Sequence, residues 1–231
     1  MLLTEDKMLK ENLEKVLNEI SSGNNLGEEI TLVGATKTMT YETINEAISY
    51  GLKVVAENKV QEFNQKTEFI SGASQHFIGH LQTNKVKYLV GKVELIHSVD
   101  SIHLAEEIDK VAKKRNLIQD VLIEVNIGGE LSKSGFDFSN AKENVLEIAS
   151  KYSNIRIIGL MAMLPHSDNQ QLLAELTKKM RNLFDEIKVK GLPFTYLSVG
   201  MSNDYKIAIQ NGSNMIRLGR TIFGERNYGV K

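Results

Sequence analysis

The chain contains no cysteine and only two prolines among its 231 residues. The absence of cysteine excludes disulfides, thiolate catalysis and cysteine-ligated metal sites. No low-complexity stretch or shift in composition marks a linker. We therefore expect residues 1–231 to form one domain, and a content of 42% hydrophobic residues is enough for a large core.

Neither sign of charge dominates, because 28 Lys and Arg residues are balanced by 29 Asp and Glu residues, for a net charge of −1. This balance lacks the basic footprint that nucleic-acid binding requires. Residues 1–7 do not have the pattern of a signal peptide. The longest apolar run, 157–164, is too short to span a bilayer. We expect a soluble cytoplasmic protein with no nucleic-acid or membrane partner.

Strand-like and helix-like patterns alternate along the chain. Residues 9–20 come first, with apolar side chains at helical spacing. Thr40 and either Asp100 or Ser101 are expected N-caps of later helices. Eight short apolar runs, each reached through a helical pattern, are expected strands at residues 30–35, 53–56, 75–78, 93–97, 121–125, 155–160, 195–199 and 215–218.

Eight strands alternating with helices predict an α/β protein of the TIM (β/α)8 barrel class, with an extra N-terminal helix. The alternative is an open doubly wound sheet, but no Gly-x-Gly-x-x-Gly fingerprint follows the first strand. Closure of a barrel places strand eight beside strand one. Arg217 and the turn after it would then lie near Lys37, at the C-terminal ends of the strands where barrel active sites form.

Lys37 follows the first strand, in the sequence Gly34-Ala35-Thr36-Lys37-Thr38. A lysine on a rigid strand end beside apolar walls is partly desolvated, and desolvation favours the neutral amine. A neutral amine can attack an aldehyde and form a Schiff base. The alternative is a strand-end lysine that extends into solvent.

Two glycine-containing stretches, 198–204 and 217–224, follow the last two expected strands. Gly219 permits close approach of backbone N–H groups to a phosphate, and the loops after strands seven and eight are the usual phosphate site of such barrels. Ser202 is expected to cap the helix that follows it, whose N-terminus also favours an anion. Two ordinary glycine turns are the alternative. An aldehyde-reactive lysine, a phosphate site and an arginine at one barrel mouth together suggest pyridoxal 5′-phosphate (PLP).

Seven motifs in order resemble those of the pyridoxal phosphate homeostasis proteins, a family similar to the barrel domain of alanine racemase. The resemblance covers essentially the whole chain. It is carried by residues 34–38, 56–58, 76–85, 132–135, 159–161, 198–204 and 217–224.

The resemblance implies a role for each matching position. Lys37 would be the Schiff-base lysine, and Arg217 would face the pyridine nitrogen. Because arginine stays protonated, that nitrogen would not be protonated, which suits storage of the cofactor better than carbanion chemistry. The remaining contacts would be Asn58 on the cofactor and, on its phosphate, Met201, Ser202, Gly219 and the backbone of Arg220.

The chain departs from the family pattern at two positions. Ala56 stands where the family commonly has glycine, and Arg220 stands where it often has a small hydroxyl residue. Backbone donation to a phosphate survives the second change, whereas a side-chain hydroxyl contact does not. Arg220 would either add charge near the phosphate or extend into solvent.

Three functions fit these motifs. The first is a non-enzymatic carrier or buffer in intracellular PLP homeostasis, with PLP-dependent apoenzymes as candidate recipients. The second is a PLP-dependent amino-acid racemase. A racemase of the resembling type takes a second base, a tyrosine, from a C-terminal domain, and this sequence ends at Lys231. We therefore expect the carrier, acting as a monomer. The third is a cofactor-free Schiff-base aldolase, which would be colourless.

Two weaker signals complete the sequence. His76 and His80 are four residues apart, as in a helical metal pair, but Gly79 and the strand pattern break the helix, so we expect structural histidines and no metal. Lys133 lies in a glycine-flanked loop, where we expect it to be solvated, although the resemblance allows it a secondary role in cofactor handling.

Overall fold

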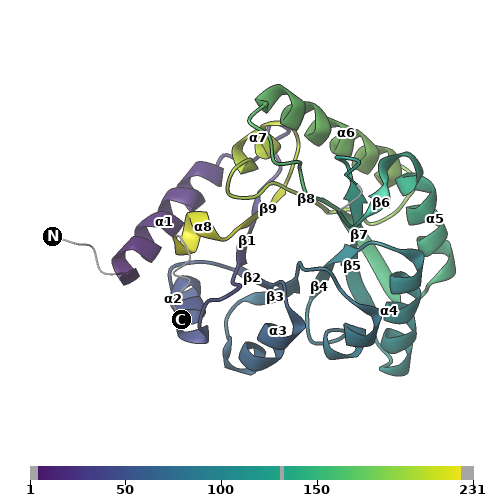
Figure 1. Cartoon of the computed structure of the whole chain (residues 1–231), viewed down its shortest axis with the longest axis horizontal. Coiled ribbons are helices and arrows are strands. Elements are labelled where there is room, and N and C mark those ends of the chain that lie inside the picture. The colour runs from purple at the N-terminus through teal and green to yellow at the C-terminus, as the bar shows by residue number, and fades with distance from the viewer. Residues whose placement is uncertain (1–4, 131–132, 225–231) are drawn as a thin grey trace.

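The computed structural model describes residues 5–130 and 133–224, in which eight parallel strands form a closed barrel (Figure 1). The barrel closes because β4 pairs with β5 at one end of the strand order and β9 pairs with β1 within it. The predicted TIM barrel is confirmed, and the open sheet is excluded. Its strands are β1 (Thr31–Ala35), β2 (Val54–Glu57), β3 (Ser74–Phe77), β4 (Leu95–Val99), β5 (Gln119–Asn126), β7 (Ile155–Ala162), β8 (Tyr196–Val199) and β9 (Met215–Leu218).

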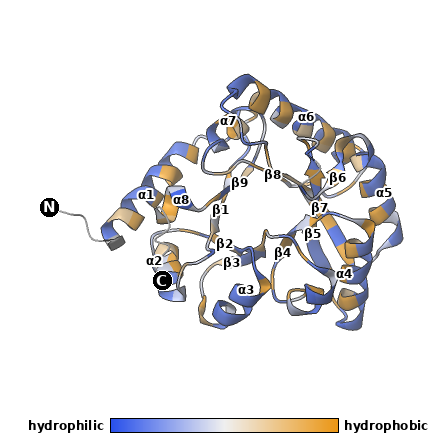
Figure 2. Cartoon of the chain, in the orientation of Figure 1, coloured by the Kyte–Doolittle hydropathy of each residue, from blue (hydrophilic) through white to orange (hydrophobic). Residues whose placement is uncertain are grey.

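Helices surround the barrel (Figure 1). Figure 2 shows hydrophilic and hydrophobic stretches alternating along their ribbons, as in helices that bury one face. The extra N-terminal helix α1 packs against α8 and α2. The α-helices are α1 (Glu5–Ile20), α2 (Tyr41–Ser49), α3 (Val60–Lys66), α4 (Ile102–Lys114), α5 (Ala141–Lys151), α6 (Gln170–Lys188), α7 (Tyr205–Gln210) and α8 (Arg220–Phe223), and the 3₁₀ helices are η1 (Thr67–Phe69), η2 (Thr83–Tyr88) and η3 (Phe138–Asn140).

Two predicted N-caps are confirmed. Thr40 accepts from the Thr43 N–H at the start of α2, and Ser101 accepts from the Leu104 N–H at the start of α4. Asn169 caps α6, and η3 precedes α5. The two-residue strand β6 (Phe136–Asp137) was not predicted, since so short a strand has no periodicity.

A cluster of buried side chains from six strands fills the barrel interior: Val33, Ala56, Leu95, Leu122, Met161 and Met215. Two larger clusters include residues of the strands together with those of the surrounding helices. Side chains alternate between the two faces of a strand. The interior face therefore continues, two residues nearer the C-terminal ends, with Asn58, His97, Glu124 and Arg217.

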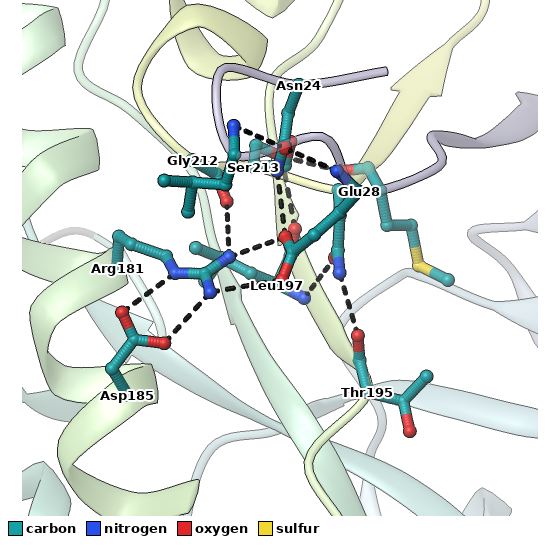
Figure 3. A network of polar contacts seen from close by, with 11 residues as sticks. Asn24, Glu28, Arg181, Asp185, Thr195, Leu197, Gly212 and Ser213 are labelled. Atoms are coloured by element: carbon teal, nitrogen blue, oxygen red, sulfur yellow. Dashed lines mark hydrogen bonds and ion pairs between the residues drawn. The ribbon is translucent and has the colours of Figure 1, made fainter.

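At the opposite end of the barrel, a polar network joins the loop before β1 to α6 and to the turn before β9 (Figure 3). Arg181 donates to both carboxylate oxygens of Glu28, at 2.6 and 3.0 Å, and to Asp185 and the Gly212 carbonyl. Asn24 donates to Glu28 and to the Ser213 carbonyl. This end of the barrel is therefore held by side-chain bonds between segments far apart in the sequence.

Within the part of the chain that the structure describes, no helix combines the length and the apolar character needed to cross a membrane.

Candidate functional site

Lys37 is half-buried and lies in a turn directly after β1. The preceding residue, Thr36, is buried, and its N–H donates to the Ala56 carbonyl of β2 at 2.9 Å. Strand pairing therefore fixes the start of the turn. Arg217 is on the neighbouring strand β9, where it lies opposite Val33. Barrel closure thus brings the lysine and the arginine to the same end of adjacent strands, as predicted.

Arg217 is 5% exposed and its guanidinium is held by oxygen atoms of two other strands. One terminal nitrogen, Nη1, donates to the carbonyl and the hydroxyl of Ser198, both at 2.7 Å. The other, Nη2, donates to the Ala162 carbonyl at 3.0 Å. Burial lowers the pKa of Arg217 to about 10, so it is charged at neutral pH. A guanidinium has more N–H donors than these bonds use, which leaves it able to bind a further acceptor.

A chain of polar side chains continues from Arg217 through the barrel interior. The Ser198 hydroxyl lies 3.3 Å from His97 Nδ1, and His97 Nε2 lies 3.0 Å from His76 Nδ1. The far end of the chain is Ser74, whose hydroxyl lies 3.0 Å from His76 Nε2. Burial lowers the pKa of His76 to about 3 and that of His97 well below its usual value. Both imidazoles are therefore neutral, and the positive charge of Arg217 further lowers the pKa of His97.

Glu124 lies on the interior face of β5 and is 3% exposed. Burial and the nearby charge of Asp100 raise its pKa to about 7, although Arg217 and His80 act in the opposite direction. The mouth of the barrel therefore contains a carboxyl group that changes protonation near neutral pH.

The two stretches predicted to bind phosphate meet. The Ser202 hydroxyl accepts from the Thr221 N–H at 3.4 Å. Gly219 lies beside β1, where an added Cβ would be in van der Waals contact with the Ala35 carbonyl oxygen at 3.4 Å. The predicted N-cap role of Ser202 is wrong, because α7 begins three residues later and its N-cap position is Asp204. Ser202 instead bridges to α8, whose residue Thr221 donates its N–H to the serine hydroxyl.

Two residues of these loops have other contacts. The Met201 N–H donates to Asp204 at 2.6 Å, so a phosphate there would compete with a carboxylate. Arg220 is exposed, and its guanidinium donates to Asn203 at 3.0 Å. Because Asn203 belongs to the 198–204 stretch, the exposed guanidinium also lies beside the predicted phosphate site, and both alternatives for Arg220 stay predictions.

Asn58 is placed at the interior face just beyond β2. Its side-chain oxygen is buried and has no hydrogen-bond partner in the described part of the chain. Gly79 packs on its backbone, because a Cβ there would come within 2.0 Å of the Asn58 carbonyl oxygen. A rigidly held amide with an unused acceptor is what a bound polar ligand would complete.

The structure also places the two histidines of the four-residue pair and Lys133. His76 bonds to His97, whereas His80 lies 3.1 Å from Asp100 and 3.3 Å from Ser134, so the two histidines of the four-residue pair have separate partners. Lys133 is not the solvated lysine we expected. Its side chain is 25% exposed and its amine lies 2.7 Å from Glu130.

Sequence reasoning did not identify Ser198, His97 or Glu124 as site residues. The signal that finds them is strand alternation: each lies an even number of residues from an interior apolar side chain of its own strand. That signal becomes usable only once the interior face of every strand is known.

In sequence and in structure, the chain is similar to members of a known protein family. A family model described as alanine racemase, N-terminal domain matches residues 9–227. A pyridoxal phosphate homeostasis protein of Aquifex aeolicus is 44% identical over 221 residues, which cover 94% of this chain and 95% of that protein. One of Escherichia coli K12 is 33% identical over 229 residues, covering 95% and 97%. The structure of PipY of Synechococcus elongatus with PLP bound has a TM-score of 0.82 and 27% identity, and the match covers 94% of this chain and 100% of that one.

Proposed function

The chain belongs to the pyridoxal phosphate homeostasis protein family, within the wider family of the alanine racemase N-terminal domain, and from this premise we propose that it binds PLP as a carrier or buffer. PLP would be held as a Schiff base on Lys37. The observation that carries the proposal is the meeting of three parts at one barrel mouth: the lysine turn after β1, the buried arginine of β9, and the loop before α7 joined to α8 by the bond between Ser202 and Thr221.

The residues at this mouth fit the cofactor. The unused oxygen of Asn58 is a feature that a bound polar group would explain. When bound, PLP supplies an aldehyde that condenses with an amine and releases water. The Lys37 amine is the nucleophile in our assignment, Asn58 contacts the cofactor, and Arg217 donates to the ring nitrogen. Met201, Ser202, Gly219 and the Arg220 backbone hold the phosphate.

The charge of Arg217 supports storage over catalysis. An arginine that stays charged cannot accept a proton from the ring nitrogen and disfavours one there. A neutral ring withdraws electrons less strongly from a bound amino acid. We therefore propose a protein that holds and releases PLP. We further propose that it acts as a monomer and supplies PLP-dependent apoenzymes.

The test is the absorption spectrum of the purified protein with PLP, followed by borohydride reduction and peptide mass mapping. We expect a yellow band, a phosphopyridoxyl label on Lys37, and loss of both in Lys37→Ala. Lys142→Ala is the matched control, because Lys142 lies on the exterior in an ion pair with Glu186. The absence of a band, or a label scattered over surface lysines, would remove the cofactor assignment.

Turnover separates the carrier from the racemase. The loaded protein is incubated with single enantiomers of amino acids, and we expect no interconversion above that of PLP alone. Racemisation that depends on Lys37 would establish an enzyme instead. Transfer to an apoenzyme separated by a membrane permeable only to small molecules tests whether delivery needs contact. Light scattering tests the monomer.

A further inference from the structure

The turn that carries Lys37 contains a residue in an unfavourable backbone conformation. The Met39 N–H donates to the Thr36 carbonyl at 3.0 Å, which makes residues 36–39 a four-residue turn. Its third residue, Thr38, has a φ of 69°. This left-handed region is ordinarily occupied by glycine or asparagine at that position and is costly for a β-branched side chain. Contacts from outside the turn must therefore maintain it.

A buried ion-pair cluster lies against this turn. It consists of Glu57 at the end of β2 and of Glu62 and Lys66 on α3, and we call it the Lys66 cluster. The Lys66 amine lies 2.8 Å from Glu57 Oε1 and 3.1 Å from Glu62 Oε2. Its side chain is 12% exposed, and that of Glu57 is 4% exposed. The cluster is thus shielded from water. Charge–charge interactions are stronger in such a low-dielectric environment than in solvent.

Every member of the Lys66 cluster contacts a residue that flanks Lys37. The Lys66 amine donates to the Thr36 carbonyl at 3.3 Å, and Glu57 accepts from the Thr36 hydroxyl at 2.7 Å. Glu62 accepts from the N–H of Thr38 at 2.8 Å. The residue before the lysine and the strained residue after it are therefore held by one set of charges.

Stability alone does not account for this cluster. Burial raises the pKa of Glu57 despite the hydrogen bonds from Lys66 and Thr36. The second oxygen of that carboxylate is buried and has no hydrogen-bond partner among the described residues. Ion pairs removed from water often return less than their desolvation costs. A function in shaping the lysine turn explains why the charges are there.

We propose that Lys66, Glu57 and Glu62 are positioning residues for Lys37. They hold the Thr36–Thr38 segment in its strained form and thereby present the amine to the barrel mouth. The consequence for cofactor attachment rests on the proposed function, whereas the effect on the turn does not.

The first test uses the full chain without PLP and the variant Lys66→Met, which keeps the length of the side chain but removes its charge. Two properties are measured: exchange of the Thr38 amide by NMR, and the rate at which formaldehyde and cyanoborohydride methylate Lys37, mapped by mass spectrometry across neutral to alkaline pH. We expect Thr38 exchange to be on the order of tenfold faster. Methylation of Lys37 should slow and its pH profile should move to higher pH, because a neighbouring positive charge has been lost.

Matched variants isolate the cause. Lys66→Arg keeps the charge and should restore most of the wild-type behaviour. Lys142→Met removes a lysine from the exterior ion pair with Glu186 and should change neither measurement. Thr38→Gly removes the strain, so Lys66→Met should have a smaller effect in that background, less than about threefold. If Lys66→Met does not fold, Glu62→Gln removes one ion pair while retaining an oxygen for Thr38. Exchange of Thr38 should again be faster, by a smaller factor, whereas the Lys37 profile should move to lower pH because a negative charge has been lost.

The outcomes separate the two proposals. A folded Lys66→Met protein with wild-type Thr38 exchange and an unchanged Lys37 profile would overturn the positioning assignment. So would an effect of equal size in the Thr38→Gly background. Failure of the wild-type chain to take up PLP would remove the proposed function, yet both turn measurements would still decide the role of the Lys66 cluster. If PLP does bind, Lys66→Met should weaken its attachment on the order of tenfold.

Discussion

The two ends of the barrel each contain a buried cation with two carboxylates, and they differ in how completely the charges are satisfied. At the base, Arg181 is 13% exposed and pairs with Glu28 and Asp185. At the mouth, Lys66 is 12% exposed and pairs with Glu57 and Glu62. Burial acts to raise the pKa of Glu57 and, to the extent that it is shielded from water, that of Glu28. The bonds from Arg181 and Asn24 outweigh it, so that the pKa of Glu28 is lowered, whereas the pKa of Glu57 remains raised.

This difference agrees with a general property of (β/α)8 barrels. Functional residues lie at the C-terminal ends of the strands, and residues at the N-terminal ends contribute mainly to stability. The planar guanidinium of Arg181 binds Glu28 through two parallel bonds, a geometry that an ammonium cannot reproduce. In the Lys66 cluster, the second carboxylate oxygen of Glu57 has no hydrogen-bond partner among the described residues, and Glu62 bonds to the turn at Lys37. We infer that the base network stabilises the fold and the mouth cluster shapes the site.

The largest effect on stability is expected at the base. Arg181→Met leaves Glu28 and Asp185 without their cation. Because both carboxylates are partly exposed and so partly screened by solvent, the loss should be about 2 kcal/mol of unfolding free energy. Urea denaturation measures the loss. Lys37 methylation and Thr38 exchange should stay at wild-type values. If Arg181→Met alters them as much as Lys66→Met does, the two networks do not differ in role.

The pH dependence should also differ between the ends. The folded protein keeps Glu124 protonated up to a pKa of about 7, whereas the unfolded chain releases that proton near 4.5. The folded state therefore binds the extra proton between these values, and Glu124 lowers stability as pH rises through this window. Glu124→Gln should add on the order of 2 kcal/mol above pH 7 and flatten that part of the curve.

Glu28 should change stability with pH in the opposite direction to Glu124. Its pKa is lowered in the folded state, so its contribution is present above the unfolded value of 4.5 and is lost as pH falls below it. Glu28→Gln should therefore weaken the protein at neutral pH and reduce the loss of stability in acid. Denaturation curves collected across acidic and neutral pH check both variants, and equal slopes for the two would contradict the assignment.

Two asparagines sharpen the comparison at a smaller scale. At the base, Asn214 accepts from the Leu197 N–H at 2.7 Å and donates to the Thr195 carbonyl at 2.8 Å. Asn214→Ala leaves both backbone groups unpaired and should cost about 1.5 kcal/mol. At the mouth, Asn58 has an unused oxygen. Asn58→Ala should cost less stability than Asn214→Ala but weaken PLP binding several-fold, as thermal unfolding and cofactor titration would show. A larger loss of stability for Asn58→Ala would make it a structural residue.

The smallest effect is expected on the exterior. Lys142 and Glu186 pair at 3.0 Å with side chains 39% and 60% exposed. Solvent screens such pairs, so Lys142→Met should change stability by less than about 0.5 kcal/mol. Thermal unfolding checks this value. A loss comparable to that of Arg181→Met would mean that exposure does not separate the charge clusters of this protein.

Most of the fold was predictable because it depends on local patterns. Apolar runs such as 121–125 indicate strands, and Thr40 and Ser101 mark helix starts by their own side-chain chemistry. The prediction failed at Ser202, where a serine before a helix suggested a cap. Its hydroxyl instead contacts the Thr221 N–H, nineteen positions along the chain. A cap depends on which way the preceding loop turns, and here the hydroxyl faces Thr221 of α8, a contact that no local pattern indicates.

The sequence by itself determined the order of strands and helices, the barrel, and the location of Lys37 and Arg217 at the same mouth. Alternating periodicities and barrel closure leave little choice in these features. The tertiary structure alone decided which polar side chains meet inside. The chain from Arg217 through Ser198 and His97 to His76 crosses four strands, and its contacts depend on their register. So does the strained φ of Thr38, which three charges from β2 and α3 maintain. Side-chain direction and non-local contact are fixed only when the strands are assembled, and a single sequence does not contain that register in readable form.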